Sequence, residues 1–180
     1  MTIKTIYFLF IYYYFLTYTG DMIILGIDPG IATTGFGVIR HEKGINKLVD
    51  CGVITTHKDL THAQRLAVLY DDLQGLMQKH QPQEVAVEKL FFSTNVTTAM
   101  TVGEARGVVL LVLQQAGVAI FEYTPLQVKQ GIAGYGKATK RQVQEMVKVR
   151  LKLSAIPKPD DAADALAIAL MHTGHIKTPR

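Results

Sequence analysis

The sequence of 180 residues contains a single cysteine, Cys51, and no tryptophan. One cysteine excludes an intrachain disulfide, and it also excludes a metal site built from several thiolates. This scarcity is typical of proteins kept in a reducing compartment, and we expect the protein to be cytoplasmic. Since Cys51 lies in a short strand-like run, we expect it to be a small residue of the core.

Repeats and linkers are also absent from the sequence. No period recurs along the chain, and no stretch rich in proline, glycine and serine divides it. The hydrophobic fraction of 48% is that of a folded globular protein, and the length suits one domain of ordinary size. We therefore expect residues 22–180 to form a single domain.

Long apolar runs are confined to the N-terminus, where residues 6–16 have the sequence IYFLFIYYYFL. A membrane span needs about 20 such residues, so this run is too short for one. It is similar to the apolar part of a signal peptide, but no cleavage site with small residues follows it. We favour a third interpretation, in which Met22 is the natural start. Residues 1–21 then form an apolar extension outside the native fold, and we expect no membrane association for residues 22–180.

Positive charge is in mild excess, with a formal net charge of +4. Residues 129–158 hold one acid, Glu145, and eight basic residues: Lys129, Lys137, Lys140, Arg141, Lys148, Arg150, Lys152 and Lys158. Such a segment indicates either a surface that contacts nucleic acid or the solvated side of a helix. Charge alone leaves both alternatives open.

The pattern of apolar residues predicts short strands at residues 23–28, 35–40, 48–55, 85–88 and 120–123. Helical spacing is found at residues 66–77, 101–115, 126–132, 140–153 and 160–172. The glycines between residues 131 and 136 predict a flexible loop. The order of elements predicts an α/β fold with one mixed sheet, in which three antiparallel strands precede parallel strands and helices flank the sheet.

Four acidic residues occupy special places in this pattern. Asp28 and Glu88 each close a predicted strand. Asp161 and Asp164 lie three residues apart at the start of the last helix, so they share one of its faces. Each has a plain structural alternative: a turn residue, a polar strand end, or compensation of the helix dipole. We interpret the neighbouring Asp160 as the N-cap of the helix.

The four acids are of the kind that holds divalent metal ions. Clustered carboxylates repel one another unless they bind a cation, and hard oxygen ligands suit Mg²⁺ or Mn²⁺. Two such ions, about 4 Å apart, can clamp a phosphodiester that undergoes in-line displacement. One ion orients the attacking hydroxide, and the other stabilises the leaving 3′ oxygen. We therefore expect a catalytic site with two Mg²⁺ ions, or Mn²⁺ in their place.

Three spaced segments carry a resemblance to a known family. ILGIDPGIATTGFGVI (residues 24–39), VAVEKLFF (85–92) and PDDAADALAIALMH (159–172) resemble the opening strand, the second acidic strand and the closing helix of RuvC Holliday-junction resolvases. Residues 121–147 also match, so the resemblance extends over about residues 22–175. It implies an RNase H-like fold and a homodimer that nicks a four-way DNA junction symmetrically during recombination and repair, leaving 5′-phosphate ends. Members of the family act with the branch-migration complex of RuvA and RuvB.

The resemblance also implies roles for single residues. The positions that match the catalytic and metal-binding acids are Asp28, Glu88, Asp161 and Asp164. Phe91 matches an aromatic residue that inserts at the junction, and Lys129 and Lys140 match basic residues near the DNA. To these DNA contacts we add Lys137 and Arg141 from the basic segment. The extra acid Asp160 departs from the family pattern, and the spacing favours Asp161 and Asp164 as the ligands.

Other functions fit parts of the sequence. Residues 28–35 (DPGIATTG) resemble the phosphate-binding hairpin of actin-like and sugar-kinase ATPases, although such proteins need two large lobes and this chain is too short for both. A non-catalytic junction-binding module with the same fold would tolerate loss of the acids, all of which are present. Another RNase H-like nuclease, acting on RNA or flaps, also stays open. His172 and His175 have a spacing that suits a metal, but no third ligand is evident.

Overall fold

The computed structural model describes residues 21–89 and 96–176 of the chain. Within these ranges the strands are β1 (Met22–Asp28), β2 (Thr33–Glu42), β3 (Ile45–Thr55), β4 (Glu84–Glu88) and β5 (Ala119–Tyr123). The helices are α2 (His62–His80), α3 (Val96–Gln115), α4 (Pro125–Ala133), α5 (Lys140–Arg150) and α6 (Asp160–Thr173). Every predicted strand and helix is present. The prediction for the N-terminal extension lies, apart from Asp21, outside the described residues, and no helix among those described could cross a membrane.

The strands form one mixed sheet in the order β3-β2-β1-β4-β5. The hairpin neighbours β1–β2 and β2–β3 pair antiparallel, whereas β1–β4 and β4–β5, which are joined through helices, pair parallel. The predicted mixed sheet is therefore confirmed. Because β1 and β4 are parallel neighbours, their C-terminal residues, Asp28 and Glu88, lie at the same edge of the sheet.

The hairpin between β2 and β3 is tighter than predicted. The predicted strands at residues 35–40 and 48–55 left residues 41–47 as their connection, but the strand pairing continues to Glu42 and Ile45. Only Lys43 and Gly44 form the turn, with φ values of 49° and 79°. Two consecutive positive φ angles are the type I′ geometry, which follows the natural twist of paired strands. The polar residues are thus the solvent-exposed end of a long hairpin.

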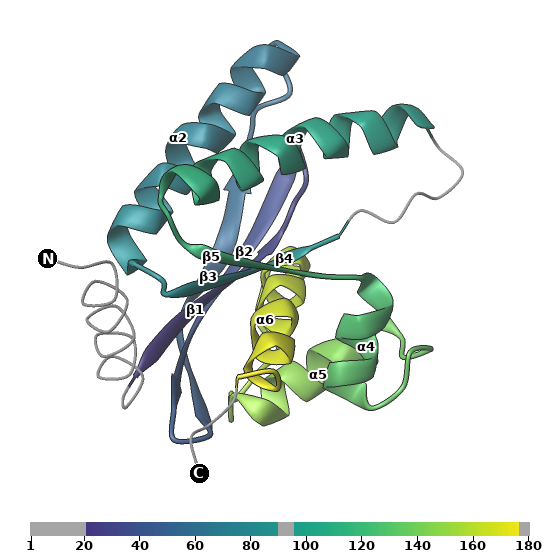
Figure 1. The fold of residues 1–180 in the computed structure, drawn as a ribbon. Coiled ribbons are helices and arrows are strands. Elements are labelled where there is room, and N and C mark those ends of the chain that lie inside the picture. Colours follow the sequence, from purple (N-terminus) through teal and green to yellow (C-terminus); the bar gives the residue numbers. More distant parts are fainter. Residues whose placement is uncertain (1–20, 90–95, 177–180) are drawn as a thin grey trace, which may run out of the picture.

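Helices cover both faces of the sheet (Figure 1). Successive strand residues point to opposite faces, so β1 contributes to two cores. Ile24 packs with α4, α5 and α6, whereas Leu25 and Ile27 pack with α2 and α3. Cys51 is partly buried at the margin of the first core. Helix α6 is deeply enclosed, with ten of its 14 residues buried.

Glycines in β1 and β2 let α6 lie directly on the sheet. A Cβ on Gly26 would lie 2.1 Å from the carbonyl oxygen of Ala165, and one on Gly35 would lie 2.1 Å from that of Asp161. Real atoms do not approach so closely, so a side chain at either position would push the helix away. This close approach brings the first turn of α6 to the end of β1, where Asp28 lies.

Helices α2, α4 and α5 begin in the same way. In each, the side chain of an N-cap threonine and that of a glutamine three residues later bond to one another's backbone N–H groups: Thr61 with Gln64, Thr124 with Gln127, and Thr139 with Gln142. The helix α4 continues through Gly131 and ends at a left-handed C-cap, Gly134, with φ 86°. The loop predicted from residue 131 onward therefore begins at Gly134, because Gly131 is helical.

Candidate active site

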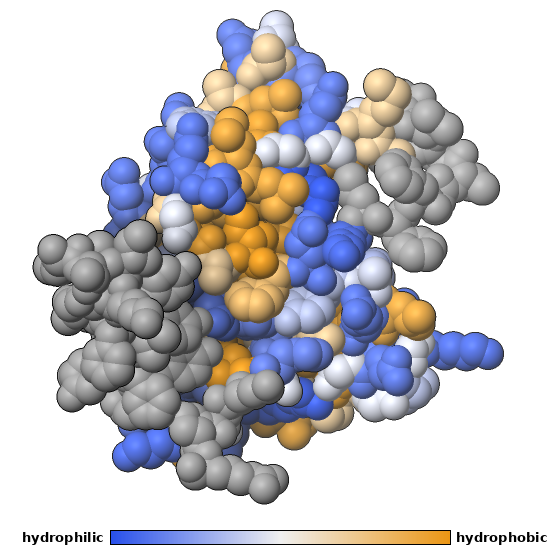
Figure 2. Space-filling view, in the orientation of Figure 1, coloured by the Kyte–Doolittle hydropathy of each residue, from blue (hydrophilic) through white to orange (hydrophobic). Residues whose placement is uncertain are grey.

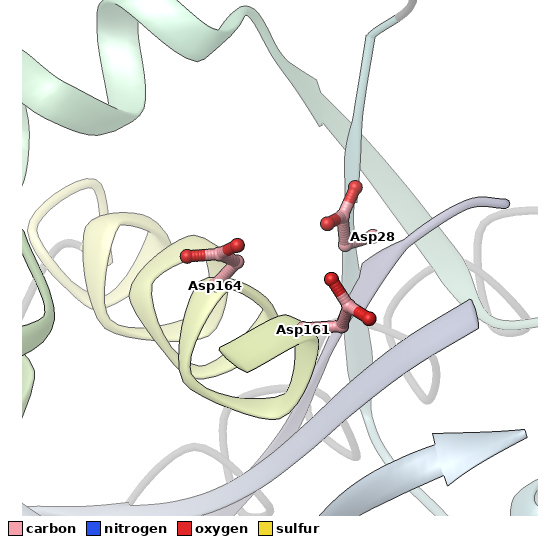
Figure 3. Close-up of side chains that lie close together, drawn as sticks. All are labelled: Asp28, Asp161 and Asp164. Carbon is pink, nitrogen blue, oxygen red and sulfur yellow. The ribbon is translucent and has the colours of Figure 1, made fainter. Parts of the chain in front are cut away.

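Asp28 is the last residue of β1 and pairs with Gly35 of β2. The first turn of α6 lies over Gly35, which brings Asp161 and Asp164 to the side of Asp28. Each of the three aspartates has a carboxylate oxygen within 4.8 Å of one from each of the other two. Figure 3 shows the three side chains around a shared space. A strand and a helix that are distant in sequence thus contribute to one acid cluster, as predicted.

Glu88 ends β4 and makes a side-chain hydrogen bond with Asp28. Burial raises the pKa of Glu88 to about 8, with further increases from the charges of Asp28 and Asp164. Burial also raises the pKa of Asp28 to about 6, with further increases from Asp164 and Asp161. At neutral pH the protonated Glu88 carboxyl therefore donates to the Asp28 carboxylate. The fourth predicted acid thus joins the cluster through Asp28.

Lys140, the first residue of α5, contacts the acid cluster at Asp164. Its Nζ lies 2.8 Å from Oδ2 of Asp164, and this contact raises the pKa of Lys140. For Asp164, burial raises the pKa, although Lys140 opposes this effect. The side chain of Lys140 is 51% exposed, so solvent screens the ion pair and a stronger partner can replace it.

A cleft of about 250 Å³ opens beside these groups. Strand ends and α6 contribute acids to it, whereas α4 and α5 contribute lysines and apolar side chains. The lining residues are Asp28, Glu88, Pro125, Val128, Lys129, Lys140, Val143, Asp164 and Ala167. Hard oxygen ligands and cationic groups therefore lie side by side in one cleft.

The residues predicted to contact DNA do not all lie at this cleft. Lys129 and Lys140 line it. Lys137 is exposed in the loop between α4 and α5, and Arg141 is 76% exposed and pairs with an acid of its own helix. Neither Lys137 nor Arg141 lines the cleft. A ligand could contact them only if it extended beyond the cleft. Phe91 lies outside the described residues.

Asp160 does not cap α6 as the sequence suggested. Pro159 is the N-cap and makes no side-chain hydrogen bond, while Asp160 is the first helical residue. Its carboxylate accepts a hydrogen bond from Lys158 at 2.5 Å. The N-cap interpretation is therefore wrong, because the helix begins one residue earlier and a neighbouring lysine holds the side chain. Asp161, rather than Asp160, belongs to the acid cluster.

The turn after β1 uses its hydroxyl groups for its own backbone. The buried Thr34 hydroxyl donates to the Gly30 carbonyl at 2.6 Å and accepts from the Gly30 N–H at 3.3 Å. Thr56 donates to the Ile31 carbonyl at 2.5 Å. The ATPase interpretation needs such a hydroxyl free to contact phosphate, and Thr34 does not offer one.

Comparisons with known proteins identify the family of this chain. A family model described as Crossover junction endodeoxyribonuclease RuvC matches residues 24–172. The chain belongs to the RuvC family. A crossover junction endodeoxyribonuclease RuvC from Roseiflexus sp. (strain RS-1) is 58% identical over 149 residues, which make up 83% of this chain and 89% of that relative.

Solved structures confirm the RNase H-like fold predicted for this RuvC-family chain. T. thermophilus RuvC in complex with a Holliday junction substrate has a TM-score of 0.77 and 36% identity, covering 84% of this chain and 93% of that one. The yeast mitochondrial Holliday junction resolvase has a TM-score of 0.60 at 15% identity, covering 82% and 77% of the two chains. The second likeness concerns the fold alone.

The histidines near the C-terminus of this RuvC-family chain do not form the metal site that their spacing suggested. Both ring nitrogens of His172 are occupied: Nε2 lies 2.6 Å from a carboxylate oxygen of Glu84, and Nδ1 lies 2.6 Å from the hydroxyl of Tyr123. The sequence does not predict this grouping, because its members are far apart along the chain. The only local indication of the group is Glu84, an acid at the start of an apolar strand.

Proposed function

We propose that this chain resolves four-way DNA junctions by metal-dependent, symmetric nicking during homologous recombination and DNA repair, leaving 5′-phosphate ends. The observation that carries the proposal is the convergence of three aspartates and Glu88 beside a cleft lined by two lysines, in a chain of the RuvC family. A relative in this family has been solved with a Holliday junction substrate. Junction DNA is therefore the substrate that we assign. We also assign the protein to the cytoplasm.

The donor set of the acid cluster fits hard divalent cations. Carboxylate oxygens are the ligands that Mg²⁺ and Mn²⁺ prefer. Burial, and after it repulsion between the acids, raises the pKa values of Asp28 and Glu88, and bound cations would favour the charged form of both. We assign two Mg²⁺ ions, replaceable by Mn²⁺, to four ligands: Asp28, Glu88, Asp161 and Asp164. When bound, such ions lower the pKa of a water and stabilise negative charge on the phosphate.

Within this assignment the four acids have different roles as metal ligands. We assign Asp28 to both ions, because it lies between Glu88 on one side and the two α6 aspartates on the other. Glu88 serves one ion and must first lose the proton that it holds at neutral pH. Asp161 and Asp164 complete the ligand set from one helix, whose buried packing keeps them in place.

The cationic groups around the cleft position the DNA strand. Lys129 and Lys140 line the cleft beside the acids, so we assign them to phosphates next to the cut. Lys137 and Arg141 are exposed beyond it and extend the positive surface along the strand. We assign Phe91 to unstacked bases at the branch point, as its place after Glu88 in the family pattern implies.

Symmetric nicking requires two active sites, and we propose that the chain is a homodimer. Helix α3 exposes large apolar side chains, with Met100 65% and Leu111 50% exposed. Figure 2 shows apolar side chains gathered over α2 and α3. Contiguous apolar surface of this kind favours contact with another protein surface. From family membership alone we further propose that the dimer acts beside the RuvA–RuvB branch-migration complex.

The deciding experiment follows cleavage of a labelled four-way junction by the whole chain with Mg²⁺ or with EDTA. We expect paired symmetric nicks that require the metal. Asp28→Asn should slow cleavage by about 100-fold or more but keep junction binding. Asp160→Asn is the matched control. Asp160 lies on the same helix turn as Asp161 but pairs with Lys158, so this variant should cleave normally.

Three outcomes would contradict the proposal. Unchanged turnover in Asp28→Asn would remove the acid cluster from the reaction. Junction binding without cleavage in either metal would leave a non-catalytic binding module. Saturable ATP binding without junction binding would support the ATPase alternative.

A further inference from the structure

Glu84, Tyr123 and His172 form a buried hydrogen-bonded group outside the acid cluster. Glu84 is 6% exposed, Tyr123 7% and His172 2%. The imidazole of His172 lies between the other two, 2.6 Å from the Tyr123 hydroxyl at Nδ1 and 2.6 Å from the Glu84 carboxylate at Nε2. The ring of Phe121 also lies against it, with centroids 4.4 Å apart. The side chain of His172 is therefore held on several sides.

The imidazole of His172 gives both of the other polar groups a hydrogen-bond partner at once. The Nε2–H donates to the carboxylate of Glu84, and Nδ1 shares a hydrogen bond with the Tyr123 hydroxyl. A buried carboxylate without a partner is costly, so Glu84 strongly favours the position of α6 that presents His172 to it. Hydrogen bonds are directional, and a shift of the helix by a fraction of a turn would break both.

The three members lie on the elements that carry or flank the acids. Glu84 begins β4, and Glu88 ends it. Tyr123 ends β5, and its carbonyl accepts a hydrogen bond of 2.7 Å from the N–H of Lys89, the residue after Glu88. His172 lies near the end of α6, the helix that carries two acids in its first turns. The group therefore connects α6 with the start of β4 and, through Tyr123, with the end of β5 that lies beside Glu88.

Where helix α6 crosses β1, its buried face carries small residues. Ala165 and Ala169 lie against Gly26 of β1, while Asp161 and Leu166 lie against Gly35 and Gly37 of β2. Contacts between alanine and glycine fix the distance of a helix from a sheet, but they resist sliding weakly because few atoms interlock. From Asp161 to His172 the helix is rigid and spans about 16 Å, so its position at one end determines the other.

We propose that His172 is a positioning residue, which acts through Glu84 and Tyr123 to fix the axial position of α6 against β4. The distance from Asp161 and Asp164 to Glu88 then depends on this hydrogen-bonded group, and so does the affinity for the metal. This inference rests on the proposed function of the acid cluster as a metal centre.

The test compares Mn²⁺ affinity and thermal stability in the absence of DNA. The triple variant Glu84→Met/Tyr123→Phe/His172→Leu replaces all three polar groups together, so no buried charge is left unpaired. Its Tm should stay within about 5 °C of the wild type. Its dissociation constant for Mn²⁺, measured by electron paramagnetic resonance of the free ion, should rise about tenfold.

Tyr123→Phe gives a milder second measurement, because it removes one hydroxyl and keeps the ring. We expect its Mn²⁺ dissociation constant to rise about threefold with a small change in Tm. The matched control is His175→Leu: this exposed histidine lies against the Tyr123 ring but has no bond to Glu84, and its loss should leave Mn²⁺ binding unchanged.

Wild-type Mn²⁺ affinity in both the triple variant and Tyr123→Phe would overturn the inference and leave the group a purely structural one. Failure of the wild type to cleave junctions bears on the proposed function instead, since the Mn²⁺ comparison does not depend on cleavage.

Discussion

Glu88 keeps a proton at neutral pH that Asp28 gives up, and their surroundings explain the difference. Burial is the largest cause of both raised pKa values. The hydrogen bond between the two carboxyls then acts in opposite directions: it lowers the pKa of Asp28, which accepts it, and raises that of Glu88, which donates it. A cation that binds both carboxylates must displace this proton, so we expect metal affinity to increase with pH.

The contribution of each cleft lysine to junction binding should be measurable from the salt dependence of the affinity. We expect Lys129→Ala and Lys140→Ala each to weaken junction binding, and to reduce the slope of log affinity against log salt by about 0.9 for one lost phosphate contact. The physical reason is that each lysine releases counterions when it meets a phosphate. Binding titrations at several salt concentrations, with EDTA present to prevent cleavage, give the slope directly.

Lys47→Ala is the control for these two variants. Lys47 is 63% exposed on β3, near the hairpin turn at the end of the strands opposite the cleft. Its removal lowers the net charge by the same amount but should leave the slope unchanged. If all three variants behaved alike, the cleft lysines would contribute only to the general charge of the protein, and the assigned phosphate contacts would be wrong.

At the scale of elements, the seating of α6 on β1 and β2 determines whether the acids meet. We expect Gly26→Ala and Gly35→Ala to displace the helix, because each new Cβ would lie 2.1 Å from a backbone oxygen of α6. The expected loss of stability is about 2 kcal/mol or more, as for overpacked cores. Urea unfolding measures this loss, and Mn²⁺ titration measures the accompanying loss of metal affinity.

Gly75→Ala is the matched control for the glycine variants. Gly75 lies within α2, and a Cβ there meets no atom within 4 Å. This replacement should stabilise the protein by about 0.5–1 kcal/mol, because alanine favours the helix. Equal effects at Gly35 and Gly75 would contradict the close seating of α6.

The sequence predicts most elements because their causes are local. The apolar run before Asp28 is a strand by its length and by the turn that follows, and the helices carry periodic apolar residues. The capping pattern of threonine and glutamine was a further local signal at three helix starts. The turn at Lys43 and Gly44 was missed because polar strand ends and loops have similar compositions.

The site could be predicted only in part, because its decisive contacts are between distant segments. Acids at strand ends identify Asp28 and Glu88, but nothing local shows that Asp160 turns to Lys158 while its neighbour Asp161 faces the cluster. The contact of Gly35 with α6 likewise depends on tertiary packing.

For the whole molecule, the apolar surface on α3 gives a test of self-association. We expect Leu111→Glu to shift the protein from dimer to monomer, because it would bury a charge in the proposed interface. Sedimentation velocity measures the change, and paired symmetric nicks should give way to slow single nicks. Val149→Glu, at a 64% exposed residue of α5 outside this surface, should stay dimeric. A wild type that is monomeric at all concentrations would contradict the dimer.

Folding stability should depend on pH through the acid cluster. Asp28 and Glu88 have pKa values of about 6 and about 8 in the folded protein, above their ordinary values of 3.8 and 4.5. Both acids therefore hold protons more tightly when folded. Their contribution is most favourable at low pH and is lost as the pH rises from about 4 to about 8.

Asp28→Asn separates this contribution from the titration of other groups. In EDTA, the variant should gain stability over the wild type as the pH increases, because it lacks one of the mutually repelling charges. Mg²⁺ at pH 8 should reverse the order, since a ligand at 100 times its dissociation constant stabilises the wild type by about 2.7 kcal/mol. Urea unfolding at several pH values, with EDTA and with Mg²⁺, measures both effects. A difference between the two proteins that stayed constant with pH would mean that other groups already neutralise the cluster, and the need for a bound cation would lose its physical basis.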